Sequence, residues 1–266
     1  MKLAICLAGG GVKGAAHIGV LKAIEEANIK YDYISGTSSG SIVASLIAMG
    51  YKSDEIYELF KKYCKKIKHI DFKNVAKLVI GIVLRRSLII DGLNSGEQIE
   101  KIINEAASKK GIYNINQIKV NLFIPSVELN TGMLYMFSSM KKRGIYSDEI
   151  KYVDDISIAK AVRASCSYPG IFSPYKYENY ELIDGGIREN IPWRETKASG
   201  ADKVFCIKFE NKKKTKCRKN IVDVLVGSSW TIKLWNRWSG LFTNTKNEQH
   251  IITRLFKNWW IIWAWI

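Results

Sequence analysis

Residues 3–14 read LAICLAGGGVKG, and this stretch decides the fold that the sequence predicts. Its first six residues, Leu3–Ala8, are all apolar, which is typical of a strand that is buried on both faces. Three consecutive glycines at 9–11 then indicate a tight turn. A helical pattern follows over Val12–Ala27. A buried strand, a glycine turn and a helix in this order indicate the start of an α/β fold.

The same alternation continues along the chain. A second strand is predicted over Tyr31–Ser35, and a helix rich in small residues follows over Ser39–Ala48. The other expected elements are strands over Asn121–Val127, Met133–Phe137, Glu181–Ile183 and Val204–Phe209, and helices that begin at Ser53 and cover Ile156–Ser165. Strands that alternate with helices predict the α/β class, here a three-layer α/β/α sandwich with a mainly parallel central sheet.

The composition is that of a globular chain. Of the 266 residues, 47% are hydrophobic and 25% are charged, which excludes a largely disordered protein. No apolar run approaches the roughly 20 residues that a membrane-spanning helix needs. The glycines at 9–11 also interrupt the first apolar run before it reaches the length of a signal-peptide core. We therefore expect a cytoplasmic protein.

The five cysteines do not indicate a metal site or a disulfide framework. They are odd in number, widely scattered and form no CxxC pair (Cys6, Cys64, Cys166, Cys206 and Cys217). Structural zinc sites and small disulfide-bonded domains have closely and regularly spaced cysteines. Reduced thiols are therefore expected, with no metal and no cofactor.

The chain carries 41 lysines and arginines against 25 acidic residues, a formal net charge of +16. Such a charge favours a polyanionic partner, which would be nucleic acid or an anionic membrane surface. The alternative is that the charge serves no specific partner. No nucleic-acid-binding motif accompanies the charge, so nucleic acid is not expected.

The basic residues are concentrated over 61–86, which hold nine lysines and arginines and one acid. Two interpretations remain open. The stretch is either a solvated helix face or an interfacial face or lid that places the protein peripherally at a membrane. In the second case the apolar positions Ile56, Leu59, Phe60, Tyr63 and Ile67 would lie toward lipid.

Two glycine-rich motifs stand at strand-to-helix junctions. Residues 9–14, GGGVKG, allow a ligand to approach the backbone, and free N–H groups at a helix start favour negative charge. The same letters satisfy the dinucleotide pattern GxGxxG, but the second strand ends in Ser35-Gly36 and lacks the acidic residue that pattern needs. Residues 36–40, GTSSG, have the form of a nucleophile elbow, in which Ser38 is held on a tight turn above the sheet.

A third motif, Asp184-Gly185-Gly186, follows the strand-like run ELI. An aspartate in this place is a candidate base, although the motif alone is also compatible with a simple turn. The α/β-hydrolase order places a histidine after the acid, which leaves only His250. His17 and His69 lie within predicted helices and are expected to be structural. The sequence therefore favours a Ser–Asp dyad without histidine.

The motifs GGGVKG, GTSSG and DGG occur together with residues 161–174, AVRASCSYPGIFSP. In this order and spacing the sequence resembles the patatin-like phospholipase family of lipid acyl hydrolases over residues 2–225. The family often has arginine where Lys13 stands. The resemblance implies a serine lipid acyl hydrolase, a carboxylic ester hydrolase similar to phospholipase A or lysophospholipase, with a lipid or phospholipid substrate. The alternative is a catalytically silent lipid- or nucleotide-binding protein.

The resemblance also implies the roles of individual residues. The catalytic dyad would be Ser38 as nucleophile and Asp184 as the base that takes its proton. The supporting residues would be the oxyanion hole of Gly9, Gly10, Gly11, Val12, Lys13 and Gly14, the elbow residues Gly36, Thr37, Ser39 and Gly40, and the motif glycines Gly185 and Gly186.

The C-terminal stretch 229–266 has an anomalous composition. Seven of the eight tryptophans lie in residues 230–266, and no aspartate follows Asp223. Read one base further along, tryptophan codons give glycine-rich sequence, so we predict that a frameshift has replaced the final strand and helix of a domain over residues 1–228. The alternative is a tryptophan-rich cationic membrane anchor. Resequencing of the gene would distinguish the two.

Overall fold

The computed structural model describes residues 1–66, 94–140 and 148–209. The predictions for His69, His250, most of the basic stretch and the tryptophan-rich tail lie outside these residues. Within the described chain, no helix is both long enough and apolar enough to cross a membrane.

The centre of the fold is a mixed sheet whose strand order is β5-β4-β3-β2-β1-β8. Its parallel part consists of β3 (Asn121–Glu128), β2 (Tyr33–Gly36), β1 (Leu3–Leu7) and β8 (Lys203–Ile207). Because parallel strands all end at the same edge, the turns that follow β1 and β2 lie side by side. This edge carries both glycine-rich motifs of the sequence.

The remaining strands extend the sheet beyond β3. Strand β4 (Leu134–Ser138) pairs with β3 in antiparallel orientation, and β5 (Ile150–Val153) pairs with β4 in parallel. Strand β7 (Tyr180–Asp184) is antiparallel to β3 and to β6 (Tyr175–Tyr177). Residue Ser126 of β3 pairs with Asp184, so the end of β7 reaches the sheet near the same edge.

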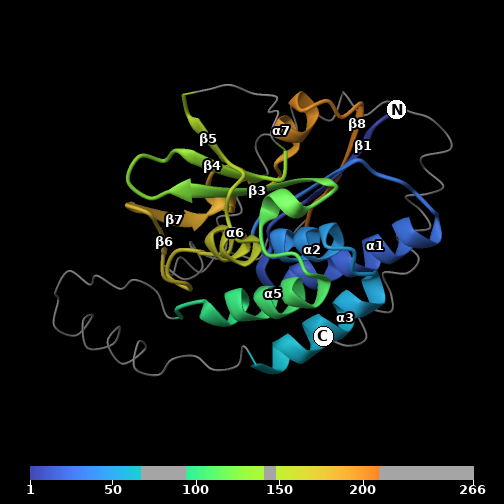
Figure 1. Cartoon of the computed structure of the whole chain (residues 1–266), viewed down its shortest axis with the longest axis horizontal. Helices are drawn as coiled ribbons and strands as arrows, with labels where there is room; N and C mark the ends of the chain where they lie inside the picture. The colour runs from blue at the N-terminus through green and yellow to red at the C-terminus, as the bar shows by residue number, and fades with distance from the viewer. Residues whose placement is uncertain (67–93, 141–147, 210–266) are drawn as a thin grey trace, which may run out of the picture. The chain divides into compact units, whose positions relative to one another are not determined.

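Helices cover both faces of the sheet (Figure 1). One face carries α1 (Ala16–Glu26), α2 (Ser39–Ala48), α3 (Ser53–Lys66), α5 (Glu97–Lys110) and α6 (Ile158–Ser165). The other carries the short helix α7 (Trp193–Ala198). The core is divided accordingly, because Ile5 and Ile34 belong to the larger hydrophobic cluster and their neighbours Ala4 and Tyr33 to the smaller one. The predicted three-layer α/β/α architecture is confirmed.

The main differences from the sequence prediction lie at the ends of elements and in short segments. The first helix begins as a 3-10 turn, η1 (Gly11–Ala15), before α1 starts. Strand β2 begins two residues later than expected. Helix α5 was not predicted, although its apolar residues Ile99, Ile102, Ile103 and Ala106 have helical spacing and are buried. The elements β5, β6 and α7 were not predicted either, and each has at most six residues.

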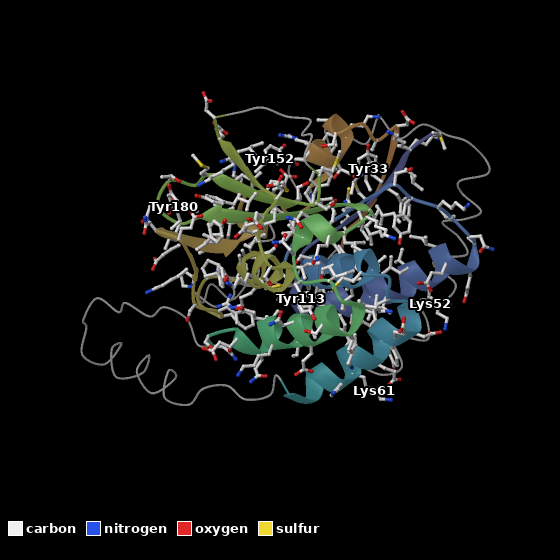
Figure 2. All side chains as sticks on the ribbon, in the orientation of Figure 1. Tyr33, Lys52, Lys61, Tyr113, Tyr152 and Tyr180 are labelled. Carbon is white, nitrogen blue, oxygen red and sulfur yellow. The ribbon has the colours of Figure 1, made fainter. Side chains whose placement is uncertain are left out.

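Helix α3 corrects one position of the expected apolar interfacial face, Ile56. Ile56 is fully buried, and Leu59 and Phe60 pack against the larger hydrophobic cluster. Lys61 instead lies on the outer side of the helix, away from the sheet (Figure 2). Ile56 therefore stabilises the fold and is not available to lipid, and Leu59 and Phe60 are partly covered by the core, whereas Lys61 remains accessible. The side chains of Tyr63 and Ile67 lie outside the described part of the chain.

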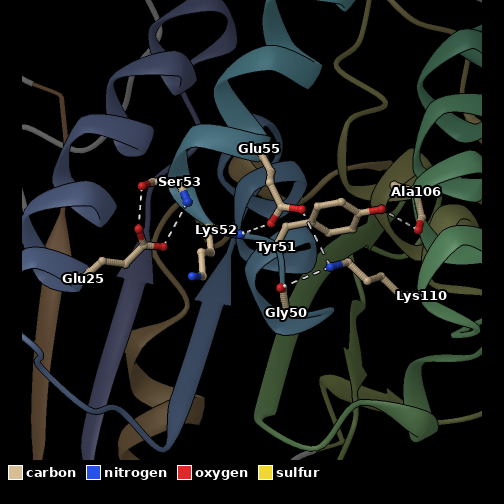
Figure 3. Close-up of polar contacts among 8 residues, drawn as sticks. All are labelled: Glu25, Gly50, Tyr51, Lys52, Ser53, Glu55, Ala106 and Lys110. Carbon is tan, nitrogen blue, oxygen red and sulfur yellow. Dashed lines mark hydrogen bonds and ion pairs between the residues drawn. The ribbon is translucent and has the colours of Figure 1, made fainter.

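The start of α3 is fixed to α1 by a partly buried polar contact (Figure 3). The carboxylate of Glu25 accepts hydrogen bonds from the Ser53 backbone N–H at 2.9 Å and from its hydroxyl at 2.5 Å. Ser53 is 2% exposed, whereas Glu25 is exposed, so the carboxylate closes the Ser53 donors off from solvent. Nearby, the Tyr51 hydroxyl donates to the carbonyl of Ala106 in α5 at 2.9 Å. The three helices are thus linked by side-chain hydrogen bonds as well as by apolar packing.

We expect Glu25→Ala to lower the free energy of unfolding by about 1.5–3 kcal/mol, because it leaves two buried donors of Ser53 without a charged acceptor. Lys22→Ala is the matched control on the same helix. Lys22 pairs with Asp54 at 2.8 Å, but both side chains are exposed, and such pairs contribute about 0–1 kcal/mol. Urea denaturation of the two variants measures the difference. Equal losses of unfolding free energy in the two variants would show that the Glu25–Ser53 contact contributes no more than an exposed ion pair.

Candidate active site

Ser38 occupies a strained turn between β2 and α2. Its backbone angles are φ +53° and ψ −124°, a region that residues other than glycine rarely adopt. The turn is held by the Ser38 N–H, which donates to Ser165 Oγ at 3.0 Å, and by the Ser38 carbonyl, which accepts from the Ser41 hydroxyl at 2.6 Å. This is the geometry of a nucleophile elbow, in which the serine side chain projects from the edge of the sheet.

The flanking glycines explain how the turn fits against the sheet. A Cβ at Gly36 would collide with the backbone of Gly40, and a Cβ at Gly40 would collide with the carbonyl oxygen of Leu7 in β1. Helix α2 can therefore begin directly against the end of β1. Thr37 completes the turn, since its hydroxyl donates to the Glu189 carbonyl at 2.9 Å.

The glycine turn after β1 lies beside Ser38. The position that a Cβ would take at Gly9 is 3.1 Å from the Cβ of Ser38. The Gly9 N–H donates to the Asn190 carbonyl at 3.3 Å, and the Gly10 N–H donates to Ser39 Oγ at 3.1 Å. Two of the N–H groups that the sequence analysis assigned to an oxyanion hole therefore have acceptors within the protein.

Two further N–H groups of this turn remain available. Across residues 1–66, 94–140 and 148–209, no acceptor is recorded for the N–H of Gly11 or Val12, and the Val12 side chain is 88% exposed. The Lys13 N–H donates back to the Gly10 carbonyl at 3.2 Å. Gly14 follows in the 3-10 turn and packs against the side chain of Ser39, where a Cβ would collide with it.

Asp184 is buried beside the elbow. Its side chain is 1% exposed, and Oδ1 accepts the Gly186 N–H at 2.7 Å, which begins the 3-10 turn η3 (Gly185–Ile187). Burial raises the pKa of Asp184 from an ordinary 3.8 to about 6, although hydrogen bonding from Ser38 and Gly186 lowers it. In the described chain Oδ2 has no partner in full hydrogen-bonding geometry. The contacts of a general base are often long before substrate binds, so the open Oδ2 leaves Asp184 a candidate base for Ser38.

Helix α6 connects the two residues, which the sequence analysis did not foresee. Ser165 at its C-terminal end receives the Ser38 N–H, and the carbonyl of Ser167 accepts the Asp184 N–H at 3.0 Å. Arg163 is 3% exposed and donates to Ser167 Oγ at 2.5 Å and to the Ser173 carbonyl at 2.8 Å. The signal was present in the AVRAS segment, which the resemblance had singled out without giving its residues a role.

The segment after Asp184 holds two acids, Glu189, which is half-buried, and Glu195, which is buried. Burial, and then the neighbouring Glu195, raise the pKa of Glu189 to about 8. Burial also raises the pKa of Glu195, which is 3% exposed. Neither carboxylate has a recorded contact with Ser38, but the main-chain carbonyls of Glu189 and Asn190 fix the two turns around it. This segment therefore sets the spacing between the glycine turn and the elbow.

The remaining candidates have structural environments. His17 is fully buried in α1, its Nε2 lies 2.8 Å from the Ala8 carbonyl, and burial lowers its pKa to about 4. Burial raises the pKa of Cys166 to about 12, so its thiol is unreactive. No cluster of three or more potential metal ligands occurs in the part of the chain that the structure describes.

The described residues thus place a buried carboxylate and a strained serine at the edge where the parallel strands end. The comparison with known families agrees. The family described as "Patatin-like phospholipase" matches residues 5–197, so the chain belongs to this family.

Relatives are found in bacteria and eukaryotes. The Bacillus subtilis protein YqhO, described as uncharacterized, is 32% identical over 193 residues, which cover 69% of this chain and 63% of that protein. Lysophospholipase NTE1 of Yarrowia lipolytica is 26% identical over 256 residues, or 95% of this chain and 16% of that protein. Rat patatin-like phospholipase domain-containing protein 7 is 27% identical over 257 residues, which cover 95% of this chain and 17% of that protein. The chain thus spans less than two thirds of each of these relatives.

VipD from Legionella pneumophila is among the solved structures that are similar to this chain. It is 17% identical, with a TM-score of 0.48, over 79% of this chain and 51% of that chain.

Proposed function

We propose that this protein is a serine lipid acyl hydrolase that uses Ser38 and Asp184 as a catalytic dyad. The observation that carries the proposal is the strained backbone of Ser38, which projects its side chain toward a carboxylate that is almost fully buried. Strain of this kind persists only where the surrounding structure enforces it, and it concentrates at functional sites. The lysophospholipase names of several relatives support a lysophospholipid as the first substrate to test.

The proposed reaction has two steps. Asp184 takes the hydroxyl proton of Ser38 as the Ser38 oxygen attacks the ester carbonyl. Asp184 then gives that proton to the departing alcohol. The N–H groups of Gly11 and Val12 stabilise the oxyanion, and an acyl-serine remains. Asp184 then activates a water molecule that releases the fatty acid. A base with a pKa of about 6 is mostly ionised at pH 7 and accepts a proton more readily than an ordinary aspartate.

The direct test is fatty acid release from lysophosphatidylcholine by the purified full chain. We expect release that a fluorophosphonate, which phosphonylates nucleophilic serines, stops completely. Lysophosphatidylcholine binding without fatty acid release would favour the catalytically silent lipid-binding alternative. Binding of a dinucleotide at the glycine turn without hydrolysis would favour the nucleotide-binding alternative.

We further propose that the positively charged face of α3 brings the enzyme to anionic membranes. Lys61 is 57% exposed, and the neighbouring Lys62 is also exposed. The only acid recorded near Lys61 is Glu58, at 3.8 Å, within the described residues. A net charge of +16 favours accumulation at an anionic surface whatever the substrate.

We expect the double variant Lys61→Glu and Lys62→Glu to weaken binding to phosphatidylserine vesicles, at about 1 kcal/mol per charge removed near the surface. The matched control reverses Lys30 and Lys119, which are exposed and precede β2 and β3, at the sheet edge opposite Ser38. Vesicle sedimentation at low and high salt measures the effect. Equal binding by both double variants would mean that α3 is simply a solvated helix face.

A further inference from the structure

The side chain of Asn190 lies between the two turns that build the proposed site. The position of a Cβ at Gly9 would be 2.7 Å from Asn190 Oδ1 and 3.1 Å from the Cβ of Ser38. The position of a Cβ at Gly186 would be 3.2 Å from the same oxygen and 2.9 Å from Asp184 Oδ1. The amide group is therefore a close neighbour of both members of the dyad, in space that glycines leave open.

The side-chain amide of Asn190 makes no hydrogen bond that would hold it in place within the described chain. The main-chain carbonyl of Asn190 accepts the Gly9 N–H, but no hydrogen bond from its side chain to any described residue is recorded. The residue is only half-buried. A rotation about the last side-chain torsion exchanges Oδ1 and Nδ2, and no described hydrogen bond opposes it. The NH₂ group can thus face Ser38 when an acceptor is present there.

The proposed reaction creates such an acceptor. The ester carbonyl oxygen becomes negatively charged when Ser38 attacks, and it needs donors on the side of the glycine turn. The Gly9 and Gly10 N–H groups are already bonded within the protein, which leaves only Gly11 and Val12 from the turn. The site would therefore gain from a third donor.

We propose that the side-chain amide of Asn190 donates a hydrogen bond to the oxyanion, together with the N–H groups of Gly11 and Val12. This inference rests on the proposed function and adds a residue to it. An amide NH₂ suits this role because it is neutral and does not titrate, so it donates to the oxyanion without exchanging a proton with Ser38 or Asp184. Gly9 then has a second role, since any side chain there would collide with the Asn190 amide.

The test compares Asn190→Ala and Asn190→Asp with the wild type, using lysophosphatidylcholine. Aspartate has the shape of asparagine but no NH₂ group, and it brings a negative charge toward the oxyanion. We expect both variants to lower kcat by about 10²- to 10³-fold with little change in KM, because the bond forms only in the transition state. Asn179→Ala is the control, since Asn179 is exposed in the turn between β6 and β7.

A second readout separates donation from mere support of the turn. The bond to Gly9 uses the main-chain carbonyl, which every variant keeps. A trifluoromethyl ketone forms a tetrahedral adduct with serine, so its inhibition constant should rise by the same factor as kcat/KM falls. Thermal unfolding temperatures should stay near that of the wild type.

Three outcomes are informative. Variants within about threefold of the wild type in kcat would overturn the role of Asn190 and leave the proposed function standing. Reduced kcat with unchanged ketone inhibition would also overturn it, because the oxyanion would then not meet the amide. A wild type that releases no fatty acid would overturn the proposed function itself, and this inference with it.

Discussion

Ser38→Ala is expected to lower kcat for fatty acid release by at least about 10³-fold, because no other nucleophile is placed to attack the ester. The fold should be unaffected. The backbone bonds of the elbow, from the Ser38 N–H to Ser165 and from the Ser41 hydroxyl to the Ser38 carbonyl, do not involve the lost hydroxyl. Labelling by a fluorophosphonate should disappear together with the activity.

Ser38→Gly tests whether the backbone of the elbow is strained. It removes the same hydroxyl, but glycine adopts a φ of +53° without strain. Relief of backbone strain outweighs the added freedom of the unfolded chain, so we expect the glycine variant to be about 1 kcal/mol more stable than the alanine variant. Urea denaturation of the two inactive proteins measures the difference.

The outcomes of this pair are separable. Residual hydrolysis in both variants would remove Ser38 from the mechanism. Loss of activity without any gain in stability for glycine over alanine would leave the nucleophile in place and show that the elbow is not strained. His17→Ala serves as a further control for the chemistry, because the proposed mechanism uses no histidine and His17 is buried in α1.

The parts of the site that could be predicted are those encoded within a few consecutive residues. GTSSG between a strand and a small-residue helix specifies its own turn, because Gly36 and Gly40 permit contacts that a Cβ would block. The aspartate in DGG likewise forms its own bond to Gly186. The parallel strands β1, β2 and β3 were predictable for a similar reason, since they are mostly buried and buried strands are nearly continuous apolar runs.

The parts that could not be predicted depend on contacts between distant segments. Ser165 and Asn190 are separated from Ser38 by well over 100 residues. The AVRAS segment marks the neighbourhood of Ser165 but does not indicate that its hydroxyl accepts the Ser38 N–H. Burial of Ile56 against the core, rather than exposure to lipid, is decided by the position of α3 on the sheet. The pKa of Asp184 also depends on tertiary burial, which moves it from the ordinary value to about 6.

Asp184→Asn is expected to abolish activity and yet to stabilise the protein at pH 8. The loss of activity should be at least about 10³-fold, because an amide cannot accept the proton of Ser38. The stabilisation follows from burial, since the native state favours the protonated carboxyl and resists its ionisation. A pKa that rises from 3.8 to about 6 corresponds to about 3 kcal/mol that the wild type loses on ionisation.

The sign of the pH dependence follows from linkage. Because the folded pKa is raised, the contribution of Asp184 to stability is full below about pH 4 and is lost as the pH rises through about 6. Asparagine does not titrate, so its advantage should be absent at low pH and should grow toward pH 8. Roughly half of the 3 kcal/mol lies between pH 5 and pH 8. The activity of the wild type should rise over the same range, with a midpoint near pH 6, as the base becomes ionised.

Urea denaturation of wild type and Asp184→Asn at pH 5 and pH 8 isolates this effect. Any constant cost of placing an amide NH₂ in the site is the same at both pH values and cancels in the difference. Other titrating groups, including Glu189 with its pKa of about 8, are present in both proteins and cancel as well. A stability difference that does not change between pH 5 and pH 8 would show that Asp184 has an ordinary pKa. The buried, weakly acidic base on which the proposed proton transfer depends would then have to be abandoned.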